Sequence, residues 1–169
     1  SWSNNNEYKN SITCRGKTFE LPDNLNPNYF CWVPSASTGI YYMVIPTKED
    51  DDYIYLDESN YDQVTEVKLT SCDNTTKINN DFLSYLPELK SVDLSGLSKI
   101  VTIADRFLCN NNLESLNLSS LSDLTGIGDN FLSFSLLLDS DDIIVPDGGF
   151  KKLSWIGMDF MSNCFSLTN

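Results

Sequence analysis

Two clusters of carboxylates are the residues of this chain whose types suggest ion binding. They are Asp50, Asp51 and Asp52 in one run, and Asp139, Asp141 and Asp142 in another. Calcium binds carboxylate oxygens together with backbone carbonyls, so either cluster could contribute ligands. Neither has the D-x-D-x-D-G spacing of a calcium-binding loop. We therefore interpret the first as a solvated hairpin tip and the second as a loop insertion, with calcium as the alternative hypothesis for both.

Nucleophilic and metal chemistry based on histidine is excluded, because the chain has no His. None of its five Cys has a His partner for activation, and no C-x-x-C pair suggests zinc or disulfide exchange. The chain also lacks a G-x-S-x-G nucleophile motif and a glycine-rich phosphate loop. The sequence therefore predicts a protein that is not an enzyme and needs no cofactor.

Two covalent modifications can be considered from residue type and spacing. Cys14 and Cys31 lie close together in the sequence and could form a disulfide, or they could equally be two buried free thiols. Asn74 and Asn117 each begin an N-x-[ST] triplet, which is the acceptor sequence for glycosylation. Such triplets arise easily by chance in a chain rich in Asn and Ser, so they add little to the interpretation.

The charge balance limits the partners that the chain can have. It has 11 Lys and Arg against 24 Asp and Glu, a net charge of −13. A nucleic acid or an anionic membrane surface needs a basic face, so we expect no nucleic-acid partner. No apolar run is long enough to span a bilayer, and we expect no membrane insertion. With 41% hydrophobic residues the chain can bury a substantial core.

An internal repeat is the strongest signal in the sequence. Three stretches, starting at Val64, Leu89 and Leu113, align at offsets of 25 and 24 residues, and a looser fourth copy covers 143–161. Seven columns of the alignment are apolar except at Thr75. They are Val67, Val92, Leu116 and Ile143; Leu69, Leu94, Leu118 and Val145; Cys72, Leu97, Leu121 and Phe150; Thr75, Ile100, Leu124 and Leu153; Ile78, Ile103, Ile127 and Ile156; Phe82, Phe107, Phe131 and Phe160; and Leu83, Leu108, Leu132 and Met161.

The spacing within each copy predicts one short strand followed by a turn. Alternation such as Val92-Asp93-Leu94 places two side chains on one face of a strand. Ile103, four residues before Phe107, indicates a helical or 3₁₀ turn that returns to the same core. One copy cannot bury its apolar edge alone, whereas stacked copies can, so the sequence predicts a solenoid with parallel strands.

The repeat resembles a known family. The pattern L-x-x-L-x-L-x-x-L, from Leu113 to Leu121, matches the leucine-rich-repeat consensus. The elements I-G-D-N-F at 127–131, I-A-D-R-F at 103–107 and I-G-M-D-F at 156–160 resemble the I-G-x-x-x-F element of BspA-like leucine-rich repeats. The resemblance covers about two thirds of the chain. It implies an adhesion or protein-binding role at the cell surface or outside the cell.

The first part of the chain does not join the repeat, so we divide the sequence into 1–57 and 58–169. Short runs rich in Tyr, Ile and Val, broken by Pro and Asp, predict three or four strands in the first part. We interpret this part as a β cap over the first repeat. The alternative is a small binding module that displays Tyr41, Tyr42, Tyr53 and Tyr55.

Solvent-facing positions of the repeat strands are the candidate partner surface. Lys68, Asp93 and Asn117 stand between apolar columns in successive copies, and Ile144 occupies the matching place in the fourth. Trp155 lies off the columns, and it either contacts a partner or packs against a neighbouring turn. The alternative for the polar positions is a plain solvated sheet, because they offer no aromatic anchor.

The end of the given sequence falls where a fifth copy would begin. Leu167 follows Phe160 by seven residues, just as Leu89 follows Phe82. We expect either a longer array of which this chain is a piece, or a second subunit that covers the apolar edge. The sequence thus predicts an α/β, β-rich leucine-rich-repeat solenoid behind an N-terminal β cap, with a non-catalytic role in protein binding or adhesion. The alternative function is a structural subunit whose repeats stack into an assembly.

Overall fold

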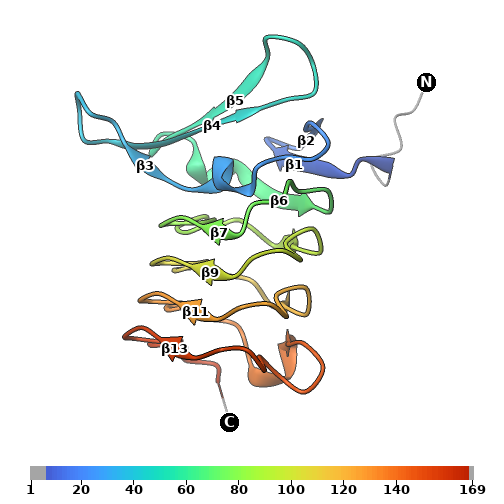
Figure 1. Cartoon of the computed structure of the whole chain (residues 1–169). Helices are drawn as coiled ribbons and strands as arrows, with labels where there is room; N and C mark the ends of the chain where they lie inside the picture. Colours follow the sequence, from blue (N-terminus) through green and yellow to red (C-terminus); the bar gives the residue numbers. More distant parts are fainter. Residues whose placement is uncertain (1–6, 168–169) are drawn as a thin grey trace.

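A computed structural model describes residues 7–167 of the chain (Figure 1). Its longer strands lie in the first 70 residues, and short strands recur after them. The strands are β1 (Asn10–Cys14), β2 (Lys17–Glu20), β3 (Val33–Pro34), β4 (Tyr41–Pro46), β5 (Tyr53–Leu56), β6 (Val64–Leu69), β7 (Lys77–Ile78), β8 (Ser91–Asp93), β9 (Thr102–Ile103), β10 (Leu116–Asn117), β11 (Gly126–Ile127), β12 (Ile143–Ile144) and β13 (Trp155–Ile156). The 3₁₀ helices are η2 (Pro27–Phe30), η3 (Tyr61–Gln63) and η4 (Ser140–Asp142).

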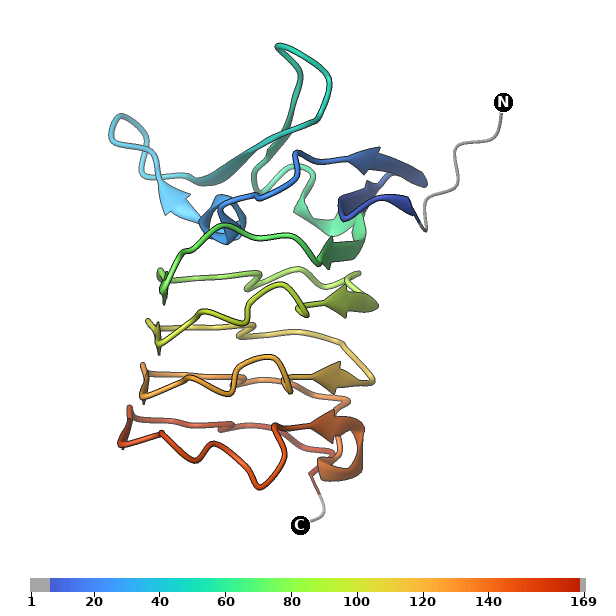
Figure 2. The same ribbon diagram turned by 45° about the vertical axis from the view of Figure 1, so that its right-hand side comes forward.

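The strands form several sheets. One has the order β2-β1-β6-β8 and is mixed, because β1 is antiparallel to β2 and β6 whereas β6 and β8 are parallel. A second, β3-β4-β5, is wholly antiparallel. The short parallel strands β7, β9, β11 and β13 make a third sheet, and β10 and β12 a fourth. Figures 1 and 2 show the third sheet as successive layers, with the β3-β4-β5 sheet projecting above the first layer.

The repeat columns are aligned by the backbone pairing. Ile78, Ile103, Ile127 and Ile156 stand directly opposite one another along the third sheet. The rings of Phe82, Phe107, Phe131 and Phe160 stack with centroids 5.1 to 5.4 Å apart and interplanar angles of 10° or less. Identical side chains thus pack on one another from layer to layer, and aromatic stacking adds about 0.5–1.5 kcal/mol per pair beyond area burial.

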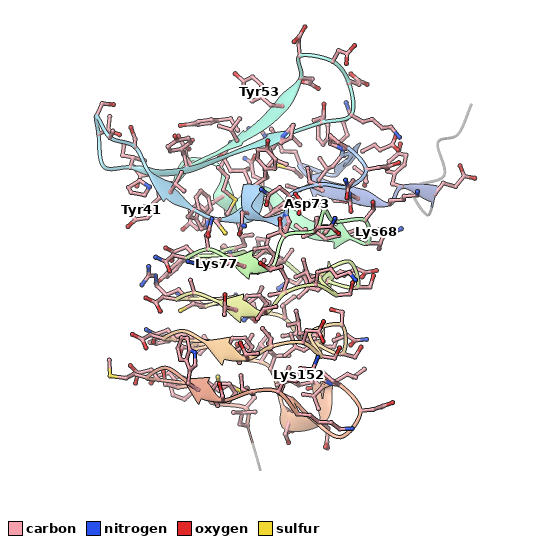
Figure 3. The ribbon with its side chains drawn as sticks, in the orientation of Figure 1. Tyr41, Tyr53, Lys68, Asp73, Lys77 and Lys152 are labelled. Carbon is pink, nitrogen blue, oxygen red and sulfur yellow. The ribbon has the colours of Figure 1, made fainter. Side chains whose placement is uncertain are left out.

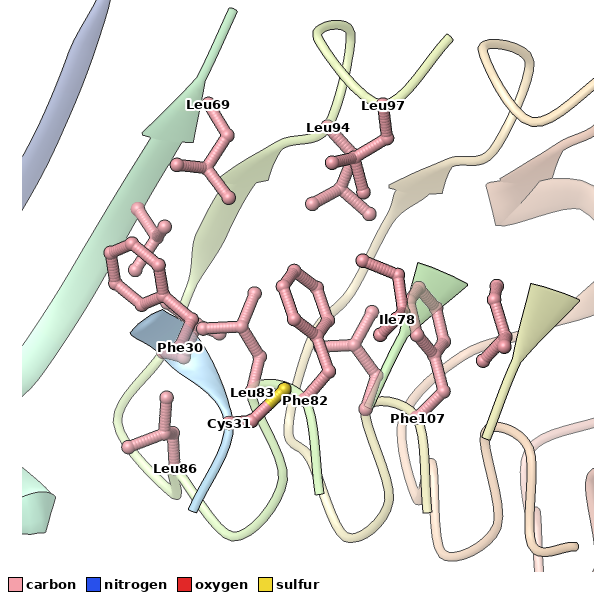
Figure 4. Packing of buried hydrophobic residues seen from close by; sticks show 14 of the residues in the cluster. Phe30, Cys31, Leu69, Ile78, Phe82, Leu83, Leu86, Leu94, Leu97 and Phe107 are labelled. Carbon is pink, nitrogen blue, oxygen red and sulfur yellow. The ribbon is translucent and has the colours of Figure 1, made fainter. Parts of the chain in front are cut away.

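A segment of the first part completes the first layer of the stack. Phe30 continues the row of buried Phe rings beside Phe82 (Figure 4). The Phe30 carbonyl accepts the Leu83 N–H at 2.9 Å, and the Trp32 N–H donates to the Asp81 carbonyl at 3.2 Å. The hydrophobic core therefore extends without interruption from Ile12 to Leu138.

The predicted fold class, an α/β leucine-rich-repeat solenoid with a β cap, is wrong. The chain is β-rich, with 30% of residues in strands and 7% in helices, and its several sheets include a mixed one. The physical reason lies at Ile103, which we expected to begin a helical or 3₁₀ turn and which instead lies in β9. Backbone hydrogen bonds to the neighbouring layers hold the segment around Ile103 in an extended conformation. One of them joins the Ala104 N–H to the Ile78 carbonyl at 2.9 Å.

Two further sequence predictions concern the chain as a whole. No helix among residues 7–167 is long and apolar enough to cross a membrane, which agrees with the expected lack of membrane insertion. The division into 1–57 and 58–169 stays a prediction, and its outer ends, 1–6 and 168–169, lie outside the described residues.

Candidate functional site

The outer face of the β3-β4-β5 sheet carries an exposed group of aromatic and aliphatic side chains. Alternation along β4 and β5 places Met43, Ile45, Ile54 and Leu56 in the core. The opposite face presents the other set, which we call the tyrosine face: Val33, Tyr42, Val44, Pro46, Tyr53 and Tyr55. None of its members carries a charge.

The tyrosine face is exposed and ordered by its own contacts. Tyr53 is 59% exposed, and Val33, Val44 and Tyr55 are also exposed. The rings of Tyr42 and Tyr55 stack with centroids 6.1 Å apart and an interplanar angle of 20°. Aromatic side chains with few rotatable bonds lose little conformational entropy on binding, so this face suits contact with a partner.

Carboxylates lie at both strand ends of the tyrosine face. The run 49–52 connects β4 to β5, and all four of its acidic side chains are exposed. Asp57 directly follows β5, and hydrogen bonds from the Ser59 hydroxyl and N–H lower the pKa of its carboxyl below the usual value. Lys48, in the β4–β5 connection beside the run 49–52, is paired with Glu20 at 3.2 Å. The rim is therefore strongly negative.

A cleft of about 800 Å³ lies on the other side of the β3–β4 hairpin, between that hairpin and the repeats. Figure 3 shows Tyr41 on the side of the sheet toward the repeats and Tyr53 on the side away from them. The cleft is lined by Trp32, Thr38, Gly39, Ile40, Tyr41, Glu58, Tyr61, Asp81, Tyr85 and Arg106. It is thus an aromatic cavity with three charged groups.

An ion pair between two repeats lies against this cleft. Arg106 Nε donates to Asp81 Oδ1 at 2.7 Å, and Arg106 Nη2 donates to Asp81 Oδ2 at 3.1 Å. The Asp81 side chain is 9% exposed. The hydrogen bonds to Asp81 raise the pKa of Arg106 above the usual value, and partial desolvation raises the pKa of the half-exposed Tyr85 nearby. Such a bidentate pair is rigid and fixes the positions of both charges.

Four of the five predicted partner-binding residues lie in two directly opposite pairs. Lys68 of β6 stands opposite Asp93 of β8, and Asn117 of β10 stands opposite Ile144 of β12. Asp93 and Asn117 line one hollow of about 430 Å³ with Ser95, Ser119 and their neighbours. Their side-chain oxygens accept the N–H groups of Ser95 and Ser119, each at 2.9 Å, so the side chains shape turns.

Trp155 lies apart from these four, in β13 of the third sheet. Its indole packs on Gly126 of the preceding layer, where a Cβ would come within 2.3 Å of Trp155 Nε1. The side chain is nevertheless half-exposed. The structure therefore shows Trp155 packing on strand β11 of the neighbouring layer, whereas we had considered a neighbouring turn, and partner contact stays a prediction.

The two acidic clusters do not assemble a metal site in the described residues. No three His, Cys, Asp or Glu side chains in the part of the chain that the structure describes could hold a metal ion. Calcium binding by Asp50, Asp51, Asp52, Asp139, Asp141 and Asp142 therefore gains no support from the described residues and stays a prediction. Asp139 and Asp142 instead form a capping box around η4. Asn74 and Asn117 are exposed, and their glycosylation stays a prediction.

Of the two alternatives for Cys14 and Cys31, the structure has two buried free thiols and not the disulfide. Cys14 ends β1 and is paired with Lys17 and Val64, whereas Cys31 bridges to Phe82 and its thiol donates to the Asn79 carbonyl at 3.6 Å. Each thiol is held by a different part of the fold, which explains why the two are not bonded to each other.

Comparison with known proteins adds no assignment. The chain matches no protein-family model, no curated protein and no solved structure.

The cleft was missed at the sequence level, while the tyrosine face was only partly anticipated. Tyr42, Tyr53 and Tyr55 were considered as displayed residues together with Tyr41, which the structure places in the cleft instead. Alternation within 40–46 and 53–57 is the signal that separates Tyr41 from the other three. Asp81 and Arg106 carried no signal, because they lie between the strands of different repeats and meet only when the repeats stack.

Proposed function

We propose that this protein is a non-catalytic protein-binding module and that the tyrosine face is its contact surface. The observation that carries the proposal is an uncharged face with exposed Tyr53, Tyr55 and Val44 on an ordered antiparallel sheet. Tyrosine is enriched at the energetic centres of protein interfaces, because its ring buries a large area and its hydroxyl can still hydrogen-bond.

The rim of the tyrosine face defines the partner further. An uncharged centre surrounded by polar or charged groups is the usual arrangement of an interface, with the rim setting association rate and specificity. Here the rim includes Asp50, Asp51, Asp52 and Asp57, and the whole chain has a net charge of −13. The partner is therefore a protein surface or segment that combines apolar and basic side chains. The surface location and adhesion role implied by the resemblance stay predictions.

Selection from a displayed peptide library tests this proposal without a known partner. The immobilised chain should enrich peptides with apolar residues next to Lys or Arg. Those peptides should lose binding to the Tyr53→Ser, Tyr55→Ser double variant, while Tyr29→Ser leaves binding unchanged. Tyr29 is a matched control, since it is exposed and lies in η2 outside the sheet. Peptides that bind wild type and double variant equally would count against the proposal.

Self-association through the edge of the fourth repeat is a second candidate, favoured by a specific observation. Ile156 is 48% exposed and Phe160 is 43% exposed, whereas their counterparts Ile127 and Phe131 in the preceding layer are buried. Met158 beside them is 70% exposed. An apolar patch next to an open strand edge is a common site of pairing with another chain.

Sedimentation of the chain over a range of concentrations tests self-association. We expect dimers or larger species at high concentration, and their loss in the Ile156→Ser, Met158→Ser variant. Phe165→Ser is the control, because this side chain is 76% exposed but lies outside the Ile and Phe columns. A monomer at all concentrations would refute this second candidate and leave the first untouched.

A further inference from the structure

We propose that the cleft between the β3–β4 hairpin and the first two repeats is a second binding site, which takes a lysine or arginine side chain from an extended peptide. It is separate from the tyrosine face, because Tyr41 and Tyr53 lie on opposite sides of the sheet (Figure 3). The inference rests on the lining and charge of the cleft, so it does not depend on the proposed function.

The walls of the cleft suit the long apolar stem of a basic side chain. Ile40, Tyr41 and Tyr85 line it and are exposed, and Trp32 and Tyr61 line it more deeply. Trp32 is held in place, because its indole N–H donates to the Ser84 carbonyl at 2.5 Å. Aromatic rings attract a Lys or Arg cation through their faces, and their apolar bodies pack along its methylene groups.

The charges of the cleft leave one carboxylate for such a cation. The lining includes Glu58, Asp81 and Arg106. Arg106 holds Asp81 in a bidentate pair, so these two charges offset each other. Glu58 is exposed and forms no ion pair with any residue between 7 and 167. The carboxylate of Glu58 can therefore form an ion pair with a bound Lys or Arg side chain.

The same arrangement disfavours an anionic ligand. Asp81 already occupies Nε and Nη2 of Arg106, which is the only basic residue in the lining as the structure describes it. An anion would also face Glu58 and the net charge of −13. Charge complementarity therefore selects a basic segment over an acidic one. A volume of about 800 Å³ has room for a side chain together with part of the backbone that carries it.

Titration with blocked pentapeptides tests the site. The probes are acetyl-Gly-Leu-X-Leu-Gly-amide with X as Lys, Arg, norleucine or Glu, and binding is followed by amide chemical shifts of the isotope-labelled protein. We expect the Lys and Arg peptides to bind about fivefold more tightly than the norleucine peptide, with shifts at Ile40, Tyr41 and Tyr85. The Glu peptide should bind most weakly.

Variants separate this site from the tyrosine face. Glu58→Gln should remove the higher affinity for the Lys peptide relative to the norleucine peptide. Glu88 is exposed and lies outside the cleft, so Glu88→Gln should leave this affinity difference unchanged. Tyr53→Ser should also leave it unchanged, so failure of the cleft and failure of the tyrosine face are distinguishable. Equal affinity for the Lys, norleucine and Glu peptides would overturn the inference. So would shifts at the cleft with maltohexaose but none with the Lys peptide, since that result assigns the cleft to a glycan.

Discussion

Asp105 Oδ1 accepts the backbone N–H of Asp129 in the next repeat, at a distance of 2.8 Å. Equivalent hydrogen bonds run from the Asp105 N–H to Asn80 Oδ1 and from the Met158 N–H to Asp129 Oδ1. One side chain per layer thus satisfies a backbone donor of the following layer. The fourth layer has Met158 at this position, where the earlier ones have an Asn or Asp acceptor. These hydrogen bonds explain why a polar residue lies two positions after the aligned Ile in each of the first three repeats.

Replacing Asp105 should distinguish the role of its oxygen from the role of its charge. Asp105→Asn keeps the acceptor, as Asn80 shows in the layer before, and should leave the free energy of unfolding unchanged within about 0.5 kcal/mol. Asp105→Leu leaves the Asp129 N–H without a partner and should cost about 1–3 kcal/mol. Urea unfolding of the two variants checks this. Equal stabilities would show that the side-chain ladder contributes nothing.

The stack of Phe rings should be the most sensitive part of the core. Phe107 is fully buried between Phe82 and Phe131, so Phe107→Ala removes two ring contacts and leaves a cavity. We expect a loss of about 3–5 kcal/mol in the free energy of unfolding. Phe165→Ala, at an exposed position, should change it by less than about 0.5 kcal/mol. Calorimetry of both variants measures these losses of stability. Similar losses for Phe107→Ala and Phe165→Ala would contradict the stacked packing of Phe107.

The contact between Gly126 and Trp155 gives a spectroscopic prediction. A methyl group at position 126 overlaps the indole, so Gly126→Ala should displace Trp155 from the preceding layer and cost about 1–3 kcal/mol. The fluorescence of Trp155 should shift to longer wavelength as the ring gains solvent. Gly126→Ala combined with Trp155→Ala should recover most of the stability. A single Gly126→Ala variant with unchanged emission would contradict this packing.

The thiols of Cys31 and Cys72 predict a loss of stability at alkaline pH. Burial raises the pKa of Cys31 and of Cys72 to about 12, from an unperturbed value of 9.0. Between these two pH values the unfolded chain releases thiol protons that the folded chain keeps, so the free energy of unfolding falls as pH rises from 9 toward 12. At pH 7 both states keep the protons and the contribution is fully present.

Thiol alkylation measures the same effect residue by residue. At pH 8.5 iodoacetamide should modify Cys31 and Cys72 in the native protein far more slowly than in denaturant, because the thiolate is the reactive species. The wild type should also lose stability between pH 9 and 11 more steeply than the Cys31→Ala variant does. Native labelling as fast as denatured labelling would show that these thiols are not protected.

The apolar columns were predictable from the sequence, but the backbone that joins them was not. Val67, Leu94 and Phe107 were placed in columns by their spacing, and all three are buried. The predicted turn at Ile103 failed, because its conformation is set by hydrogen bonds to other layers rather than by local preference. Leu108 shows the same effect, since its φ of 46° is rare for a branched residue and is held by its N–H bond to the Phe82 carbonyl at 2.8 Å.

The candidate site was predictable only where it depends on strand alternation. Tyr53 and Tyr55 are two residues apart in one run, so their common face follows from local sequence. Glu58 and Arg106 line one cleft although 48 residues separate them, a proximity that depends on how the hairpin lies over the repeats. Local sequence patterns contain no such information, which is why the cleft needed the structure.

Amide hydrogen exchange of the chain, with and without a peptide selected from the displayed library, tests the central claim most directly. The account predicts that bound peptide slows exchange in β3, β4 and β5, which carry the tyrosine face, and that the Tyr53→Ser, Tyr55→Ser variant shows no such slowing. Slowed exchange confined to the repeats, or equal slowing in the double variant, would contradict it.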